Sequence, residues 1–239
     1  MIKRVYSPDE LFLLPESGIE AQKIRALLFA YGTKYDFCRF YVSESVILCE
    51  TNGSFVLCEY TKNGDANELA EFLAFHGFSE IFCSETLGGS LSKLLHCRFQ
   101  KINLMRFCGK AVSCGNIETS PPLNEVYKII KTAFDIEYEQ WYSDMSHRIR
   151  HGVSGARVLD CSALMIQYNL NGEALLSQIA TLPEHRGMSG ASRLIKTVCA
   201  ELSESTVCVL CEDKLLPFYS GLGFEKISEK MILTRSDGK

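Results

Sequence analysis

A glycine-rich stretch between residues 179 and 195 has the residue types and spacing of an anion-binding site. Ile179–Leu182 predicts the end of a strand, Pro183–Ser189 a tight loop, and Gly190 the start of a helix. The first turn of a helix leaves backbone N–H groups unpaired, and the aligned peptide dipoles add partial positive charge there. Small residues at 187 and 189–191 let a phosphate approach the backbone, and Arg186 supplies a charged donor at the rim. A pyrophosphate could therefore sit here, although a plain glycine-rich turn into a helix is the simpler alternative.

The loop has neither the GxxxxGK[ST] pattern of a P-loop nor the GxGxxG of a dinucleotide fold. It resembles the acetyl-CoA-binding motif Q/R-x-x-G-x-G/A of the GNAT superfamily of N-acetyltransferases. Arg186 takes the Q/R position and Ala191 the final G/A position, whereas Ser189 stands where the first Gly usually stands. A second block, Leu216–Phe224, resembles the F-Y-x-x-x-G-F segment of the helix after the fifth strand of this family. The resemblance covers about residues 122–235 and implies the GNAT fold, a mixed α/β sheet.

The same resemblance implies the site residues. Backbone groups of Ile179, Ala180 and Thr181 would pair with the pantetheine arm of acetyl-CoA where this strand parts from its neighbour. Tyr219 would be the general acid that protonates the departing thiolate, which suits a phenol of ordinary pKa about 10. A packed helix residue is the alternative interpretation of Tyr219. Backbone N–H groups of the loop would hold the pyrophosphate: Arg186, Gly187, Met188, Ser189, Gly190 and Ala191.

Two positions depart from the family pattern. Ser189 replaces the usual Gly, with Gly190 directly after it, so we expect the flexible residue to be shifted along the loop. Glu212 stands seven residues before Tyr219, where many members have an Asn that contacts the cofactor, and a carboxylate cannot donate that hydrogen bond. The motif does not fix a general base. Glu212, Glu173, His185 and a water-mediated path all remain candidates.

Hydrophobic periodicity predicts the elements that position these residues. An Asn-Gly pair at 171–172 joins two of the strands and is a strong hairpin signal. The predicted order is helix, helix, three strands, helix, strand, helix, strand, over 123–134, 137–150, 156–160, 162–169, 174–181, 190–202, 206–211, 214–222 and 226–234.

The N-terminal half repeats this order in outline, with a second Asn-Gly turn at 52–53 and Asp65 as a helix cap. Its predicted elements are 20–31, 37–42, 45–50, 54–60, 65–76, 79–83, 86–95 and 98–107. Thr61–Ala66, where a phosphate loop should lie, is a poor anion cradle because a carboxylate competes with phosphate. We therefore expect two GNAT-like domains in tandem: a degenerate or accessory domain, 1–115, and an acetyl-CoA-binding domain, 116–239. One mixed α/β domain with an N-terminal extension is the alternative.

Composition and charge bear on whether the protein binds nucleic acid or associates with membranes. The chain has 239 residues, 46% of them hydrophobic, with a formal net charge of -4 and a pI of about 5.8. No basic field argues for nucleic acid or anionic lipid as a partner. The sequence shows no signal peptide and no apolar run long enough to span a bilayer, so we expect a cytoplasmic protein without membrane association.

Eleven cysteines and a pair of histidines could suggest a metal site, but their placement argues against one. The cysteines are spread along apolar runs and are odd in number, which is typical of buried, reduced thiols. Cys208 and Cys211 lack a second CxxC pair. His147 and His151 share a helical face, but they have no third ligand nearby and flank two arginines. We expect no metal.

The leading hypothesis is an N-acetyltransferase in which a primary amine attacks the acetyl-CoA thioester directly. The acceptor, a small molecule or a peptide, is not fixed by the sequence, and transfer of a longer acyl or an aminoacyl group stays open. A catalytically inactive module that binds CoA or a protein partner is the alternative, motivated by Ser189 and Glu212. The N-terminal domain could wall the acceptor cleft or form a homodimer.

Overall fold

The computed structural model describes residues 1–61 and 65–235, which form two compact units. Unit 1 comprises the described residues from Met1 to Asn103 together with the C-terminal segment from Ser228 to Arg235, and unit 2 comprises Leu104–Ile227. The sequence placed the division at 115/116. The compact units differ from that linear split because the end of the C-terminal strand groups with the N-terminal part of the chain.

Unit 1 places helices against a mixed sheet. Leu48, Phe55, Leu73 and Ile81 belong to its hydrophobic core, where two helices, Ala66–His76 and Glu85–Leu94, cover the strands. The elements are β1 (Lys3–Arg4), the 3-10 helix η1 (Pro8–Leu11), α1 (Ile19–Tyr31), β2 (Cys38–Val42), β3 (Val46–Thr51), β4 (Ser54–Glu59), α2 (Ala66–His76), β5 (Glu80–Ser84), α3 (Glu85–Leu94) and β6 (Arg98–Phe107). β4 and β5 are parallel, and β2, β3 and β4 pair antiparallel.

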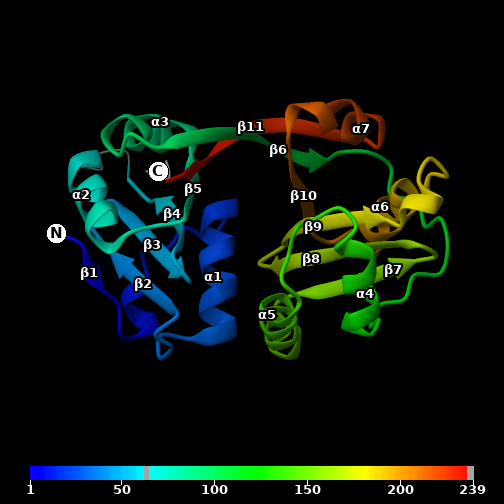
Figure 1. The fold of residues 1–239 in the computed structure, drawn as a ribbon, viewed down its shortest axis with the longest axis horizontal. Coiled ribbons are helices and arrows are strands. Elements are labelled where there is room, and N and C mark those ends of the chain that lie inside the picture. Colours follow the sequence, from blue (N-terminus) through cyan, green and yellow to red (C-terminus); the bar gives the residue numbers. More distant parts are fainter. Residues whose placement is uncertain (62–64, 236–239) are drawn as a thin grey trace. The chain divides into compact units, whose positions relative to one another are not determined.

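Unit 2 repeats this arrangement. β7, β8 and β9 pair antiparallel, and β9 and β10 are parallel. The elements are α4 (Leu123–Ile130), α5 (Tyr138–Arg150), β7 (Gly155–Leu159), β8 (Ser162–Leu170), β9 (Glu173–Thr181), η2 (Pro183–His185), α6 (Gly190–Glu201), β10 (Thr206–Cys211), η3 (Asp213–Leu215), α7 (Leu216–Gly221) and β11 (Phe224–Thr234) (Figure 1).

The strands follow the hydrogen-bonded order β1-β2-β3-β4-β5-β11-β6-β10-β9-β8-β7. β6 and β11 are neighbours in this order, and each has residues in both units. The C-terminal part of β11 pairs antiparallel with β5, from Lys230↔Ser84 to Thr234↔Glu80. The predicted mixed α/β fold is confirmed. The sequence did not predict that β6 and β11 would each have residues in both units.

Local chemistry explains where the predicted elements begin and end. Asp65 caps α2, since its side chain accepts from the N–H groups of Asn67 (2.9 Å) and Glu68 (3.3 Å). Both Asn-Gly turns adopt positive φ, 49° and 82° at 52–53 and 50° and 71° at 171–172. The helix predicted over 123–134 ends earlier, at Ile130, because the next residues form the i→i+3 bonds of a turn, such as Ala133 N–H to the Ile130 carbonyl.

All eleven cysteines are outside disulfide bonds, and six of them are buried. Burial raises the pKa of Cys58, Cys83 and Cys199 to about 12, so these side chains stay protonated at neutral pH. In the described residues, no group of three or more His, Cys, Asp or Glu side chains is arranged to hold a metal ion. Within the same residues, none of the helices has the length and apolar content needed to cross a membrane.

Two adjacent glycines in α3 provide a matched pair of substitutions. A Cβ at Gly88 would lie 2.7 Å from Met231 Cβ and 3.1 Å from Cys83 Sγ, whereas a Cβ at Gly89 would have no atom within 4 Å. We predict that Gly88→Ala lowers the free energy of unfolding by about 1–3 kcal/mol through overpacking. Gly89→Ala should raise it by about 0.5–1 kcal/mol, because alanine restricts the unfolded chain and favours helix. Urea denaturation of both variants tests this, and equal effects would contradict the packing of α3 on β11.

Candidate cofactor and catalytic site

The two parallel strands of unit 2 part at the position that the sequence predicts for the pantetheine arm. β9 pairs with β10 only from Glu173↔Thr206 to Leu176↔Val209. β9 nevertheless continues to Thr181 and β10 to Cys211. Ser177–Thr181 therefore has a backbone edge that no residue of β10 covers in this register. Ile179, Ala180 and Thr181 lie in this uncovered segment.

An irregularity in β9 coincides with the parting. The β8–β9 register shifts between Ala163 and Met165, and Gln178 in the opposing part of β9 has φ 49°. One extra residue on β9 at this point is a β-bulge, which bends a strand. The Gln178 side chain accepts a 2.9 Å hydrogen bond from Nε1 of Trp141, which is 5% exposed on α5. The structure therefore gives Trp141 a specific role, because its indole N–H holds the bulge.

The loop after β9 leads to the open N-terminus of α6. Ser189 is the N-cap residue, but its side chain makes no capping hydrogen bond, and the first turn has no acidic residue. Within the described part of the chain, the backbone N–H groups of 187–192 donate to no acceptor. These N–H groups and the positive end of the helix dipole are therefore available to an anion.

Position 189 keeps the backbone conformation that glycine favours. Ser189 has φ 59° and ψ 16°, in the left-handed region, and Gly187 has φ 81°. Gly190 is the first helical residue and does not have positive φ. The expectation that the Ser–Gly order shifts the special conformation along the loop is therefore wrong, because the serine itself adopts it. Left-handed backbone costs a residue with a Cβ roughly 1–2 kcal/mol.

We predict that Ser189→Gly raises the free energy of unfolding by about 0.5–1 kcal/mol. The substitution relieves the left-handed strain and loses no capping bond, and the entropy of the unfolded glycine offsets part of the gain. Ser192→Gly is the control, since position 192 is inside α6 and does not have positive φ. It should lower stability by a similar amount. Thermal and urea unfolding compare the two, and a loss of stability in Ser189→Gly would contradict the strain.

Gly190 is required by close packing. A Cβ at this position would lie 2.5 Å from Oγ of Ser162. Ser162 is 1% exposed, and its hydroxyl forms a 2.8 Å hydrogen bond with Oγ1 of Thr181. The start of α6 therefore packs against β8 and the end of β9, and glycine is needed for that approach.

Arg186 organises the loop with its side chain. Its Nε donates to the Thr181 carbonyl (3.1 Å), and its Nη2 donates to the Thr132 carbonyl (3.2 Å), after α4. Its backbone N–H donates to the Pro183 carbonyl (3.3 Å). The guanidinium is exposed but engaged, so in this structure Arg186 ties the loop to β9 and α4. The unpaired backbone donors begin at Gly187.

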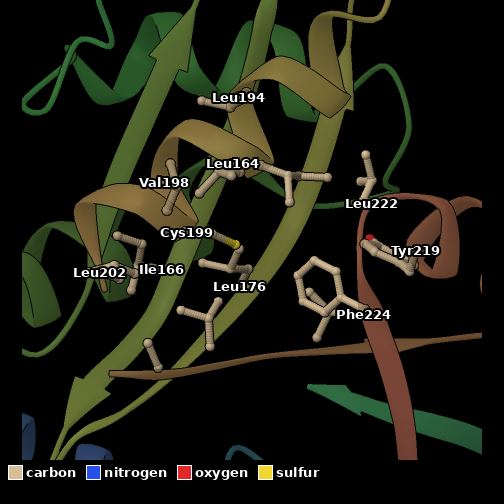
Figure 2. Packing of buried hydrophobic residues seen from close by; sticks show 14 of the residues in the cluster. Leu164, Ile166, Leu176, Leu194, Val198, Cys199, Leu202, Tyr219, Leu222 and Phe224 are labelled. Carbon is tan, nitrogen blue, oxygen red and sulfur yellow. The ribbon is translucent and has the colours of Figure 1, made fainter. Parts of the chain in front are cut away.

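Tyr219 lies in the hydrophobic core of unit 2, at one end of the cluster with Leu222 and Phe224 (Figure 2). It is 7% exposed, and its ring packs edge-on to Phe224 with centroids 5.6 Å apart. Burial, followed by the nearby Cys211, raises the pKa of Tyr219 to about 12. Cys211 is the last residue of β10, so the phenol lies beside the end of the strand that parts from β9.

The three candidate bases have different positions. Glu173 begins β9 and pairs with Thr206, so it is eight strand residues, about 26 Å, from Thr181. His185 ends η2, directly before Arg186. Glu212 follows β10 directly and pairs with Lys214 (Nζ to Oε2, 2.7 Å), with 45% of its side chain exposed. Glu212 is therefore the candidate at the end of β10, and Glu173 is at the wrong end of β9.

In unit 1, side chains of the unit itself occupy the corresponding strand ends and helix N-terminus. β4 and β5 pair over a similarly short stretch, Ser54–Val56 with Glu80–Phe82. Beyond this pairing, the Ser84 hydroxyl donates to Oε2 of Glu59 (2.5 Å). Asp65 already caps the N-terminus of α2. Residues 62–64 of the predicted non-binding loop lie outside the described residues, whereas the described residues around them place carboxylates where unit 2 has unpaired N–H groups.

Solved structures with the same fold cover nearly the whole chain. A GCN5-related N-acetyltransferase from Kribbella flavida aligns with a TM-score of 0.65 at 12% identity, over 92% of this chain and 95% of that one. A Drosophila protein aligns with a TM-score of 0.70 at 12% identity, over 99% of both chains. A tandem GNAT protein from the clavulanic acid biosynthesis pathway aligns with a TM-score of 0.57 at 12% identity, over 100% and 99%.

No family model and no curated protein matches the sequence. The structural similarities confirm the predicted GNAT fold, in a tandem arrangement over the full length of the chain.

Proposed function

We propose that this GNAT-fold chain is an N-acyltransferase that binds acetyl-CoA in unit 2 and transfers the acetyl group to a primary amine. The observation that carries the proposal is the parting of β9 from β10 next to an α6 N-terminus whose N–H groups are unpaired. An extended amide-containing arm fits a strand edge that lacks a partner, and a pyrophosphate fits an open helix N-terminus.

The residues would divide the binding between them. The uncovered edge of Ile179, Ala180 and Thr181 would hold the pantetheine amides. The N–H groups of Gly187, Met188, Ser189, Gly190 and Ala191 would hold the pyrophosphate, with Arg186 fixing the loop through Thr181 and Thr132. When bound, acetyl-CoA supplies an acyl group already activated as a thioester.

The protonation states of the site favour direct attack by the amine. The pKa of Cys211 is raised by burial, and that of Cys208 is raised to about 11, so neither thiol is a ready nucleophile at neutral pH. Tyr219 keeps its proton and can donate it to a developing thiolate. Glu212, at the end of β10, or a water beside it, would accept the proton of the amine.

The test is a calorimetric titration of the full chain with acetyl-CoA, comparing wild type with Ala191→Glu. The substitution places a carboxylate in the first turn of α6, where it opposes the pyrophosphate while interacting favourably with the helix dipole. We expect the affinity to fall at least about tenfold, which corresponds to about 1.4 kcal/mol. The unfolding free energy should not fall.

Asn67→Glu is the matched control, because it adds the same charge to the first turn of α2, which Asp65 already caps. Its affinity for acetyl-CoA should equal that of wild type. If wild type does not bind millimolar acetyl-CoA, or if both variants lose affinity equally, the proposed site is wrong.

A non-catalytic CoA-binding module is the second candidate. It is favoured by Glu212, which occupies the usual Asn position and is paired with Lys214. Such a module would bind acetyl-CoA and respond to Ala191→Glu, but it would release no free thiol with any amine. An acceptor screen that follows thiol release separates the two.

A further inference from the structure

A cavity of unit 2 lies outside the proposed cofactor site. It has a volume of about 830 Å³ and is bordered by α5, β7 and the C-terminal end of α6. None of the residues assigned above to acetyl-CoA or to catalysis lines it. Its size is within the range of small-molecule pockets. Its apolar wall includes Ile149, Val153, Ile166 and Leu202.

The ion pair in this cavity is held by several hydrogen bonds. Arg157 and Glu201 are joined through Nε (3.1 and 2.8 Å to the two carboxylate oxygens) and through Nη2. Nη1 of Arg157 donates to the carbonyls of Thr119 (3.0 Å) and Ala156 (2.9 Å). The pair therefore contributes no net charge, and all three guanidinium nitrogens already donate to acceptors of the chain.

The remaining polar groups are mostly donors. Arg150 uses only Nε, which donates to the Ser146 carbonyl (3.2 Å), so within the described residues its two terminal nitrogens have no partner. Asn169 accepts from the Ser205 hydroxyl through Oδ1 (2.9 Å), which leaves its amide nitrogen available. The Tyr142 hydroxyl also makes no hydrogen bond in the described part of the chain. The cavity thus presents donors, one unpaired positive charge and no unpaired carboxylate.

A peptide strand is a poor occupant, although β7 is the last strand of the sheet order. Val158 exchanges two backbone hydrogen bonds with Glu118 (2.8 and 3.1 Å), and the Arg157 side chain covers the Ala156 carbonyl. The outer edge of β7 is therefore already blocked at two adjacent outward positions. A compact ligand fits this cavity better than an added strand.

We propose that this cavity binds a small organic anion in which one carboxylate is attached to an apolar chain. The carboxylate pairs with Arg150, with Asn169 and Tyr142 as further donors, and the chain packs on Ile149, Val153 and Ile166. Guanidinium and carboxylate form the strongest such pair, and the apolar wall adds area-dependent affinity. The proposal does not depend on acetyl-CoA binding.

The probe is octanoate, compared with octylamine of equal chain length, titrated into the full chain and followed by methyl NMR. We expect octanoate to shift the methyl signals of Ile149, Val153 and Ile166 and octylamine to bind at least tenfold more weakly. Arg150→Gln should weaken octanoate at least tenfold, whereas Arg150→Lys should keep most of the affinity. Position 150 is exposed, so both variants are expected to fold.

Ser146→Phe, which places a ring into the cavity from α5, is the second variant and should weaken octanoate regardless of charge. Lys128→Gln, on the exposed part of α4, is the matched charge control and should bind octanoate like wild type. Equal binding of octanoate and octylamine, unchanged affinity in folded Arg150→Gln, or shifts confined to methyls outside the cavity would each overturn the proposal.

Discussion

Lys230→Met should lower the free energy of unfolding by about 3–5 kcal/mol. Lys230 lies on β11, and its Nζ contacts Oε1 of Glu20 on α1 at 2.6 Å. The side chains of Lys230 and Glu20 are only 14% and 11% exposed. Removal of the ammonium leaves a carboxylate that is buried and uncompensated, and this desolvation penalty accounts for most of the loss.

The double variant Glu20→Leu/Lys230→Met should recover most of that loss. An apolar pair of similar volume avoids the desolvation of two charges, so replacing both partners is often neutral. Lys128→Met is the control, because Lys128 and Glu125 form a 2.8 Å ion pair with side chains that are 60% and 54% exposed. Its effect should stay below about 1 kcal/mol.

Urea unfolding measures these differences with two probes. Far-UV circular dichroism follows the whole chain, and the fluorescence of Trp141, the single tryptophan, follows unit 2. If the two units unfold separately, circular dichroism should show two transitions and Trp141 fluorescence only that of unit 2. Lys230→Met should then shift the transition of unit 1, which appears in the circular dichroism signal alone. A loss of less than 1 kcal/mol in the single variant, or a double variant no more stable than it, would contradict the buried pair.

The Glu20–Lys230 pair also shows which part of the fold could not be read from the sequence. Periodicity and Asn-Gly turns locate the strands because these signals are local, and Arg98–Phe107 is predicted with its observed bounds. Which strand pairs with which is a long-range choice. Lys230–Thr234 pairs with β5 in unit 1, although β11 itself begins three residues after the end of α7 in unit 2. Lys230 is one of four charged residues in the last strand, and its partner Glu20 is 210 residues away, so no local pattern marks the pair.

The candidate site was likewise predicted only in its local parts. The order strand, glycine-rich loop, helix was predicted because each part has its own residue signature. Two arrangements were missed. The hydrogen bond between Trp141 and Gln178 joins α5 to a bulge, and the Arg186 side chain ties the loop to Thr132. Both depend on side chains that meet only after packing. The left-handed backbone at Ser189 had a signal, since the family motif places glycine at that position.

Tyr219→Phe should lower kcat at least about 100-fold with an amine that supports turnover, and should leave the affinity for acetyl-CoA nearly unchanged. The variant keeps the ring that packs on Phe224 and removes only the hydroxyl. General acid catalysis typically contributes a factor of 10²–10⁴, so a loss of about that size is expected if the phenol protonates the leaving thiolate. Release of free thiol in the presence of spermidine, an aminoglycoside or a lysine peptide measures the rate. Tyr6→Phe, at a 71% exposed position in unit 1, is the control and should behave as wild type.

The pH dependence separates a catalytic phenol from a structural one. The pKa of Tyr219 is about 12 in the folded chain and about 10 in a model peptide, so the folded state holds this proton more tightly. The stability that the protonated phenol contributes is therefore complete below pH 10 and is lost as the pH rises from 10 to 12. Wild type should lose stability relative to Tyr219→Phe only in that range. Below pH 10 the phenol stays protonated, so Tyr219 causes no alkaline fall in kcat there, whereas the variant should be slow at every pH. An unchanged rate in folded Tyr219→Phe would leave Tyr219 as a core residue of α7 and would favour the non-catalytic module.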